Sequence, residues 1–280
     1  MRVAFLAALA LIVGIRFWLS RRQERSVLAH RDAVPEAFSG SIPLEAHQKA
    51  ADYTLARLKF ARVSIFCRVG LLLAWTIGGG LDWVARQWPA GGLWTDTGFV
   101  LVVLLAGEIL LLPLSYYETF RIEQRFGFNR TTVPMYWSDF YKQVLIGVLL
   151  GGPLIAAALW LAARDLWWQL WAGWVMFTFF ITWAFPVFLA PIFWKFEPLE
   201  DGALKSRLDA LLERTGFRND GLFRMDGSRR SARANAYFTG IGAKKRIVLY
   251  DTLCEQLAPD EIEAVLAHEL GHFRLHHVRA

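Results

Sequence analysis

Cysteine is nearly absent from this 280-residue chain, which contains only Cys67 and Cys254. Cys67 lies in a long apolar stretch and Cys254 in a more polar part, so we expect two free thiols rather than a disulfide. Neither has the spacing of a zinc knuckle, which excludes a cysteine-based metal site. The chain also lacks internal repeats and low-complexity runs, which excludes a repeat architecture.

Charge is scarce as well, and tryptophan is absent from the last part of the chain. Charged residues make up 20% of the sequence and hydrophobic residues 55%, which is too apolar for an ordinary soluble domain. All 13 tryptophans lie before Lys195. We therefore expect a membrane domain over residues 1–194 and a soluble domain over residues 195–280.

Five apolar stretches precede Lys195, and each is close to the roughly 20 residues that cross a bilayer. They are Val3–Leu19, about Val63–Leu81, Phe99–Tyr116, Val144–Ala163 and Trp167–Trp194. About five transmembrane helices are expected. A cleaved signal peptide is the alternative for the first stretch, but no cleavage site follows Leu19, which favours an uncleaved anchor.

Lysine and arginine next to the spans predict the orientation. The first connection is strongly basic, whereas residues 82–98 hold only Arg86. The first connection is therefore expected in the cytosol, and alternation of the spans puts residues 195–280 there too. We expect a multi-pass protein of a bacterial inner membrane, or of the endoplasmic reticulum in a eukaryote. Because the basic residues follow the spans, the net charge of +6 indicates the lipid bilayer as partner and no nucleic acid.

Arg68 and Glu108 are charges inside two of the apolar stretches. Such charges are costly in a bilayer and face a cavity or one another. They either line a polar chamber near the active site or have a structural role, as an ion pair or, for Arg68, by snorkelling to the interface.

The soluble part has an α+β pattern. A helix over about Leu199–Arg214, ended by Gly216, precedes a strand near Gly221–Met225 and a polar loop, residues 226–233. Two β-prone runs, 236–239 and 246–250, then form a predicted hairpin that leads straight into another helix. This last helix should begin near Pro259, with a buried stripe of Ile262, Val265, Leu266 and Leu270.

That helix carries His268-Glu269-Leu270-Gly271-His272, an HExxH motif. Histidines four residues apart on a helix point the same way and can bind one zinc ion, with the glutamate as general base. The alternative is an accidental match, with both histidines as ordinary surface or core residues. The predicted fold class is mostly α: multi-span membrane helices followed by the start of a small α+β zinc-metalloprotease domain.

The predicted hairpin can have two roles. A sheet edge beside the metal aligns an extended peptide by backbone hydrogen bonds in strand addition. The other possibility is that the hairpin only supports the motif helix.

Longer runs resemble the type I CAAX prenyl endopeptidases over nearly the whole chain. The runs are Asn235–Gly240, Lys245–Leu253 and Glu261–His272, with earlier pieces at His47–Thr54, Phe126–Asn129 and Phe196–Gly202. The resemblance implies a zinc endopeptidase whose site opens into a chamber within seven membrane helices. It implies His268 and His272 as zinc ligands, Glu269 as base, and a substrate-binding edge at Asn235, Ala236, Tyr237 and Phe238.

Members of that family carry the third zinc ligand, a glutamate, on a later helix, followed by two more spans. We therefore expect one Zn²⁺ per chain with its third protein ligand beyond residue 280, and a gene product that continues past Ala280. His276 is a poor substitute, because it is rotated by roughly 80° from His268 around the helix axis. These 280 residues are expected to bind zinc poorly by themselves.

The predicted function is an integral-membrane zinc metalloendopeptidase that hydrolyses bonds near the C-terminus of peptide or protein substrates, prenylated or membrane-embedded, with a zinc-activated water. The alternative is a non-catalytic membrane protein, such as a transporter or assembly factor, with a structural metal site or none. Structural zinc sites are closed and often rich in cysteine. Glu269, beside the two histidines, therefore favours the enzyme.

Overall fold

The computed structural model describes residues 2–217, 221–239 and 246–274, with the backbone alone for residues 239, 269 and 272–274. The chain is mostly helical, as the sequence predicts. Its contacts divide it into two compact units. The first consists of Met1–Gly127 and Ile146–Leu159, and the second of Phe128–Leu145 and Trp160–Ala280.

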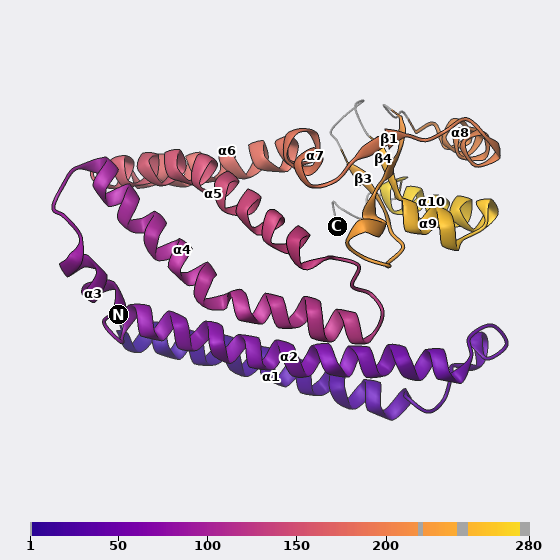
Figure 1. Ribbon diagram of the computed structural model, residues 1–280, viewed down its shortest axis with the longest axis horizontal. Helices are drawn as coiled ribbons and strands as arrows, with labels where there is room; N and C mark the ends of the chain where they lie inside the picture. Colours follow the sequence, from indigo (N-terminus) through magenta and orange to yellow (C-terminus); the bar gives the residue numbers. More distant parts are fainter. Residues whose placement is uncertain (1, 218–220, 240–245, 275–280) are drawn as a thin grey trace. The chain divides into compact units, whose positions relative to one another are not determined.

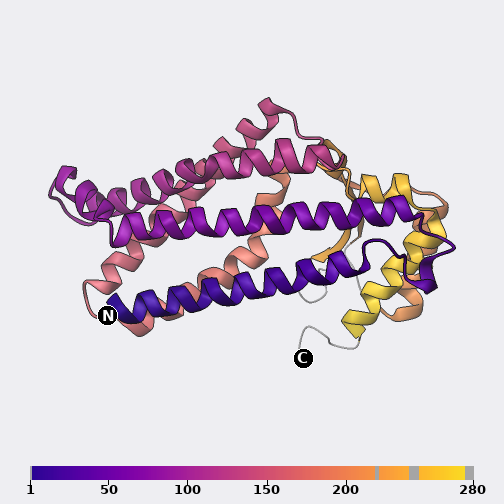
Figure 2. The ribbon, with the colours of Figure 1, turned by 90° about the horizontal axis from the view of Figure 1, so that it is seen from below.

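The first unit contains two long helices, α1 (Arg2–His30) and α2 (Leu44–Thr76), which lie side by side and run in opposite directions (Figures 1 and 2). Arg62 of α2 donates two hydrogen bonds to the Glu24 carboxylate of α1, each 3.0 Å long. Both helices extend beyond the predicted apolar stretches, so the basic connection between them is largely helical.

Further helical segments follow in chain order. They are α3 (Gly80–Gln87), α4 (Leu93–Tyr117), a π-helical segment (Glu118–Glu123), α5 (Val133–Ala162), α6 (Trp167–Ala184), a second π-helical segment (Phe185–Leu189) and α7 (Ala190–Phe193). Within the described ranges, four helices are long and apolar enough to cross a membrane, and the pair α2 and α3, bent by 50°, makes a fifth candidate. Their positions agree with the five predicted stretches.

The second unit contains a four-stranded sheet in the order β1-β2-β4-β3. Its strands are β1 (Phe196–Pro198), β2 (Leu222–Met225), β3 (Ala236–Thr239) and β4 (Arg246–Tyr250). The predicted hairpin is confirmed, since β3 and β4 pair antiparallel. β2 pairs parallel with β4 and antiparallel with β1, a strand that the sequence analysis did not predict.

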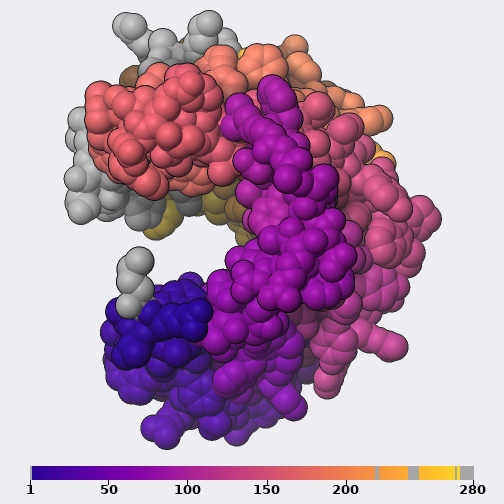
Figure 3. All heavy atoms as spheres, turned by 90° about the vertical axis from the view of Figure 1, so that its left-hand side faces the viewer, coloured from indigo at the N-terminus to yellow at the C-terminus, as the bar shows by residue number. Residues whose placement is uncertain are grey.

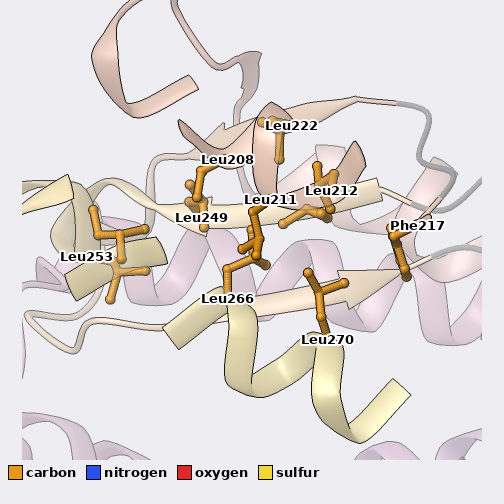
Figure 4. Packing of buried hydrophobic residues seen from close by; sticks show 11 residues of the cluster. Leu208, Leu211, Leu212, Phe217, Leu222, Leu249, Leu253, Leu266 and Leu270 are labelled. Atoms are coloured by element: carbon orange, nitrogen blue, oxygen red, sulfur yellow. The ribbon is translucent and has the colours of Figure 1, made fainter. Parts of the chain in front are cut away.

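One face of this sheet is covered by helices that enclose the core of the second unit (Figure 4). The helices are α8 (Ala203–Thr215), α9 (Asp251–Gln256) and α10 (Pro259–Arg274). Leu208, Leu211 and Leu212 of α8 are buried in this core, and the helix predicted over about Leu199–Arg214 is confirmed. Gly216, with φ 65°, ends α8 in the left-handed conformation that glycine adopts without strain.

The path from the hairpin to the motif helix differs from the prediction. The hairpin does not lead straight into α10, because α9 intervenes. Asp251 starts α9 and is 7% exposed; its carboxylate accepts hydrogen bonds from the Thr252 and Ser228 N–H groups, each at 2.8 Å, and from the Ser228 hydroxyl. The backbone is thus fixed to a distant loop before α10 begins.

Candidate active site

The helix that carries the HExxH motif, α10, has a capped start. The Glu261 carboxylate accepts a hydrogen bond from the Ala258 N–H at 2.8 Å, and the Ile262 N–H donates to the Ala258 carbonyl at 3.0 Å. Asp260 and Glu261 lie in the first turn, where the helix dipole favours negative charge. The predicted start near Pro259 is confirmed.

One face of α10 packs on the core, and another faces away from it. Ile262, Leu266 and Leu270 are at most 4% exposed. Figure 4 shows Leu266 and Leu270 on the side of α10 that packs in the core. Val265 is 36% exposed, so its place in the predicted buried stripe was wrong. At about 100° per residue, Val265 is rotated by about 100° from Leu266 around the helix axis. Position 268 is rotated by about 160° from Leu266 in the same direction. Val265 therefore belongs to the histidine face of the helix.

The structure describes part of the motif. The His268 side chain is exposed, whereas the side chains of Glu269 and His272 lie outside the described residues. The backbone of α10 is helical through both positions, so residues 268 and 272 share one face, about 40° apart. This arrangement fits two ligands of a zinc ion. Within the described part of the chain, no group of three potential ligands gathers.

The predicted substrate edge lies along β3. Asn235 is exposed just before the strand; its carbonyl accepts a hydrogen bond from the Tyr250 N–H at 3.0 Å. Ala236 and Phe238 are half-buried against the core. Because β3 is last in the strand order, its edge opposite β4 has no strand partner among the described residues. This edge keeps backbone groups available for another strand.

Tyr237, the fourth predicted substrate residue, lies on the face of the sheet opposite the core. Its hydroxyl contacts the Met225 sulfur at 3.8 Å, and its ring lies edge-on to Tyr250, with centroids 6.2 Å apart. Burial raises the pKa of Tyr237 to about 12, and it raises that of Tyr250 as well. Both phenols are therefore neutral near pH 7.

A pocket of about 320 Å³ adjoins Tyr237. Its lining comes from the end of α6, from the segment that follows α6 and from the sheet: Thr182, Phe185, Pro186, Ala190, Trp194, Met225, Tyr237, Phe238 and Tyr250. The lining is apolar and aromatic apart from a few hydroxyl groups. Sequence analysis missed Phe185, Pro186 and Trp194, because nothing local in an apolar span marks a residue that will contact a distant sheet.

The loop before β3 is fixed by contacts with two other parts of the chain, the first of which is the start of α9. Asp251 binds Ser228, and Thr252 donates its hydroxyl hydrogen bond to the Arg233 carbonyl at 2.8 Å. Gly227 allows Tyr250 to approach: a Cβ at position 227 would lie 2.5 Å from the Tyr250 ring. The polar composition predicted a loop here, but not these contacts.

The second set of contacts comes from α5 and from the segment between α4 and α5. Arg230 donates two hydrogen bonds to the Asp139 carboxylate of α5, from Nε at 2.8 Å and from Nη2 at 2.9 Å, and both side chains are largely buried. The Arg230 carbonyl accepts from the Arg130 N–H at 3.1 Å and from the Thr131 hydroxyl at 3.2 Å. The guanidinium also lies over the Trp194 ring, 5.4 Å from its centroid. The approach to β3 is therefore fixed on both sides.

The charges predicted inside the spans are not paired with each other. Arg68 in α2 and Glu108 in α4 are both exposed, and no ion pair joins them among the described residues. Arg68 lines a hollow of about 530 Å³ together with Arg16, Arg57 and Glu118. The ion-pair alternative is therefore not supported. Cys67 and Cys254 are free thiols, as expected.

Two family comparisons cover most of the chain. Residues 23–195 match the family described as CAAX prenyl protease N-terminal, five membrane helices, and residues 198–280 match Peptidase family M48. The chain is 36% identical over 258 residues to the CAAX prenyl protease 1 homolog of Arabidopsis thaliana, a match that covers 87% of this chain. It is 43% identical over 171 residues to CAAX prenyl protease 1 of Saccharomyces cerevisiae, covering 60% of this chain.

The fold is similar to the crystal structure of S. mikatae Ste24p. The TM-score is 0.87 at 31% sequence identity, and the match covers 97% of this chain and 66% of that chain. The chain spans 61% of the length of the Arabidopsis relative, and its match spans 38% of the Saccharomyces cerevisiae relative.

Proposed function

This chain belongs to the CAAX prenyl proteases of peptidase family M48, and we propose that it forms the membrane domain and the motif-bearing part of an integral-membrane zinc metalloendopeptidase. The observation that carries the proposal is the placement of the HExxH motif. Positions 268 and 272 of the motif share the face of α10 that is turned away from the core, and the opposite face of this capped helix packs against a sheet with an available edge strand.

In this proposal His268 and His272 hold the zinc ion. When bound, zinc supplies a Lewis acid that acidifies water and polarises the scissile carbonyl. Glu269 removes a proton from the attacking water and passes it to the leaving amine. The Ile262, Leu266 and Leu270 stripe fixes α10 beneath the sheet and so orients the histidine face.

The substrate is proposed to lie along β3. An extended peptide pairs its backbone with the available edge of the strand at Asn235–Phe238, in strand addition. Alternate side chains of that peptide then point to the face where Tyr237 lies, beside the apolar pocket. The pocket favours an apolar group, so we infer substrates with apolar residues near the cleaved bond, from prenylated or membrane-embedded proteins cut near their C-terminus.

Residues 1–194 act as the membrane domain in this proposal, and residues 195–280 lie on the cytosolic side. The strongly basic connection between α1 and α2 supports that orientation. The membrane is a bacterial inner membrane or the endoplasmic reticulum.

The decisive variant is Glu269→Gln in the full-length gene product. Loss of the general base should lower peptide hydrolysis by about 10²- to 10⁴-fold, whereas zinc content should stay at the wild-type level. Hydrolysis of a fluorogenic apolar peptide and metal analysis of the purified protein measure the two effects. Glu255→Gln on α9 is the matched control and should leave both unchanged. Undiminished hydrolysis by Glu269→Gln would remove Glu269 from the mechanism and favour a non-catalytic role for the motif.

A further inference from the structure

A long groove follows one face of α1 in the first unit, where α1 packs on α2. Figure 3 shows these helices in indigo and purple, with the N-terminal end of α1 toward the viewer. The groove has a volume of about 850 Å³, within the range of small-molecule sites. Its lining comes from Leu6, Leu9, Ala10, Val13, Gly14, Phe17, Trp18, Arg21, Arg22 and Arg25 of α1, and from Phe66, Val69 and Leu73 of α2.

The lining changes character along its length. From Leu6 to Trp18 it is entirely apolar, and beyond Trp18 α1 contributes only arginines. The apolar part rises by about 18 Å along the helix axis at 1.5 Å per residue. One leaflet of a bilayer contains about 15 Å of hydrocarbon, half of the core thickness. The apolar part therefore matches one leaflet, and the arginines lie at the depth of the headgroups.

The positive end of the groove is poorly neutralised. Glu24, the nearest carboxylate on α1, already accepts both hydrogen bonds from Arg62 and lies 3.9 Å from Arg21. Neither Arg22 nor Arg25 has a carboxylate within ion-pair distance in the described part of the chain. Arg21 and Arg22 lie over the rings of Phe17 and Trp18, 5.2 and 5.8 Å from the centroids. These ring contacts hold two cations at the mouth of the apolar groove.

Gly14 leaves room in the middle of the groove. A Cβ at this position would meet nothing within 4 Å. The neighbouring Ala10 is also small, so neither side chain would obstruct an acyl chain that lies along this part of α1.

We propose that this groove binds an anionic phospholipid, with the phosphate at Arg21, Arg22 and Arg25 and an acyl chain along the face from Trp18 to Leu6. The charges select the occupant. A zwitterionic lipid offers the arginines no net negative charge, and a soluble anion leaves the apolar part without a partner. Basic pockets between membrane helices recognise acidic headgroups in this way. The groove belongs to the first unit and α10 to the second, and lipid binding does not depend on proteolysis.

Lipid selectivity of the purified full-length gene product tests the headgroup. Native mass spectrometry with phosphatidylglycerol and phosphatidylcholine of identical acyl chains gives the ratio of the two affinities. The wild type should prefer phosphatidylglycerol, and Arg22→Gln with Arg25→Gln should lower that preference by roughly 25-fold, since each basic residue near an anionic surface contributes about fivefold. Lys49→Gln with Lys59→Gln removes the same charge outside the groove and should change it less than twofold.

A second arm tests the groove itself. Gly14→Leu places a side chain in the open space and keeps every arginine, so binding of long-chain phosphatidylglycerol should weaken several-fold. Glycerol phosphate, which has the anionic group but no acyl chain, should not compete. The proposal would be overturned if the arginine and the lysine double variants lost the preference for phosphatidylglycerol equally. Full competition by glycerol phosphate would also overturn it. Circular dichroism of each variant verifies that α1 remains helical.

Discussion

At the scale of single residues, the pair of Arg230 and Asp139 shows how the site depends on distant parts of the chain. The two residues are 91 positions apart and meet through two parallel hydrogen bonds. Arg230 is also in the loop that leads to β3, and its carbonyl binds the segment before α5. One side chain and one carbonyl thus fix the loop, and with it the entry to the edge strand.

Breaking this pair should be costly, because one charge would stay buried without its partner. Arg230→Ala is expected to destabilise the protein by about 3 kcal/mol. Arg229→Ala removes an exposed neighbour and should cost under about 1 kcal/mol. Thermal unfolding in detergent measures both. Replacing both partners, Asp139→Leu with Arg230→Met, should recover much of the lost stability. A double variant as unstable as Arg230→Ala alone would show that the unpaired charge of Asp139 is not the cause of the loss.

At the scale of secondary-structure elements, β3 has two different faces. Ala236 and Phe238 pack on the core side, while Tyr237 is half-buried on the opposite face against Met225 and Tyr250. A substrate strand paired with β3 would inherit the same alternation. The burial of Tyr237 therefore depends on how closely the sheet packs against the residues that line the apolar pocket.

This packing predicts a loss of stability at alkaline pH. Burial raises the pKa of Tyr237 from 10.0 to about 12. Between these values the unfolded chain loses the phenol proton and the folded chain keeps it, so stability is complete below pH 10 and falls as the pH rises toward 12. Tyr237→Phe should reduce this loss of stability between pH 10 and 12, and the raised pKa of Tyr250 should account for the remaining loss. Tyr141→Phe, at a 67% exposed position, should leave it unchanged. Unfolding midpoints between pH 9 and 12 measure the effect; identical curves for Tyr237→Phe and the wild type would contradict it.

The elements also show what the sequence could predict. Apolar length located the spans, and Gly216 marked the end of α8, because both signals are local. The start of the motif helix was predicted from Pro259. The short strand β1 and the parallel pairing of β2 with β4 depend on contacts between distant segments, which no local pattern encodes. Val265 was misassigned because a helical stripe is wide enough to include residues at its border with the histidine face.

The candidate site shows the same difference between local sequence signals and contacts made by distant segments. The spacing of the motif was enough to nominate His268, Glu269 and His272, whereas the substrate edge at Asn235–Phe238 was implied by the family resemblance. The apolar pocket beside Tyr237 combines a π-helical turn after α6 with three strands, and the Arg230 pair combines a loop with α5. Such sites arise from tertiary packing, so a sequence pattern reveals the chemical groups but not their surroundings.

At the scale of the whole molecule, the distribution of charge predicts which side of the membrane each connection occupies. The connection between α1 and α2 is rich in arginine, whereas residues 82–98 contain only Arg86. Since basic connections remain in the cytosol, the first should be cytosolic and the second should face outward. Cysteine labelling in sealed vesicles or cells tests this, after Cys67→Ser and Cys254→Ser remove the native thiols.

A membrane-impermeant maleimide should react with Ala90→Cys in intact cells, but with Ser39→Cys only after the membrane is opened. Both positions are exposed, so local burial does not decide the outcome. A background with neither new cysteine is the control for nonspecific labelling. The reverse pattern would place the α1–α2 connection outside. Because four candidate spans, an even number, follow that connection, the reverse pattern would also place the HExxH helix outside the cytosol. Cytosolic proteins could then no longer be its substrates.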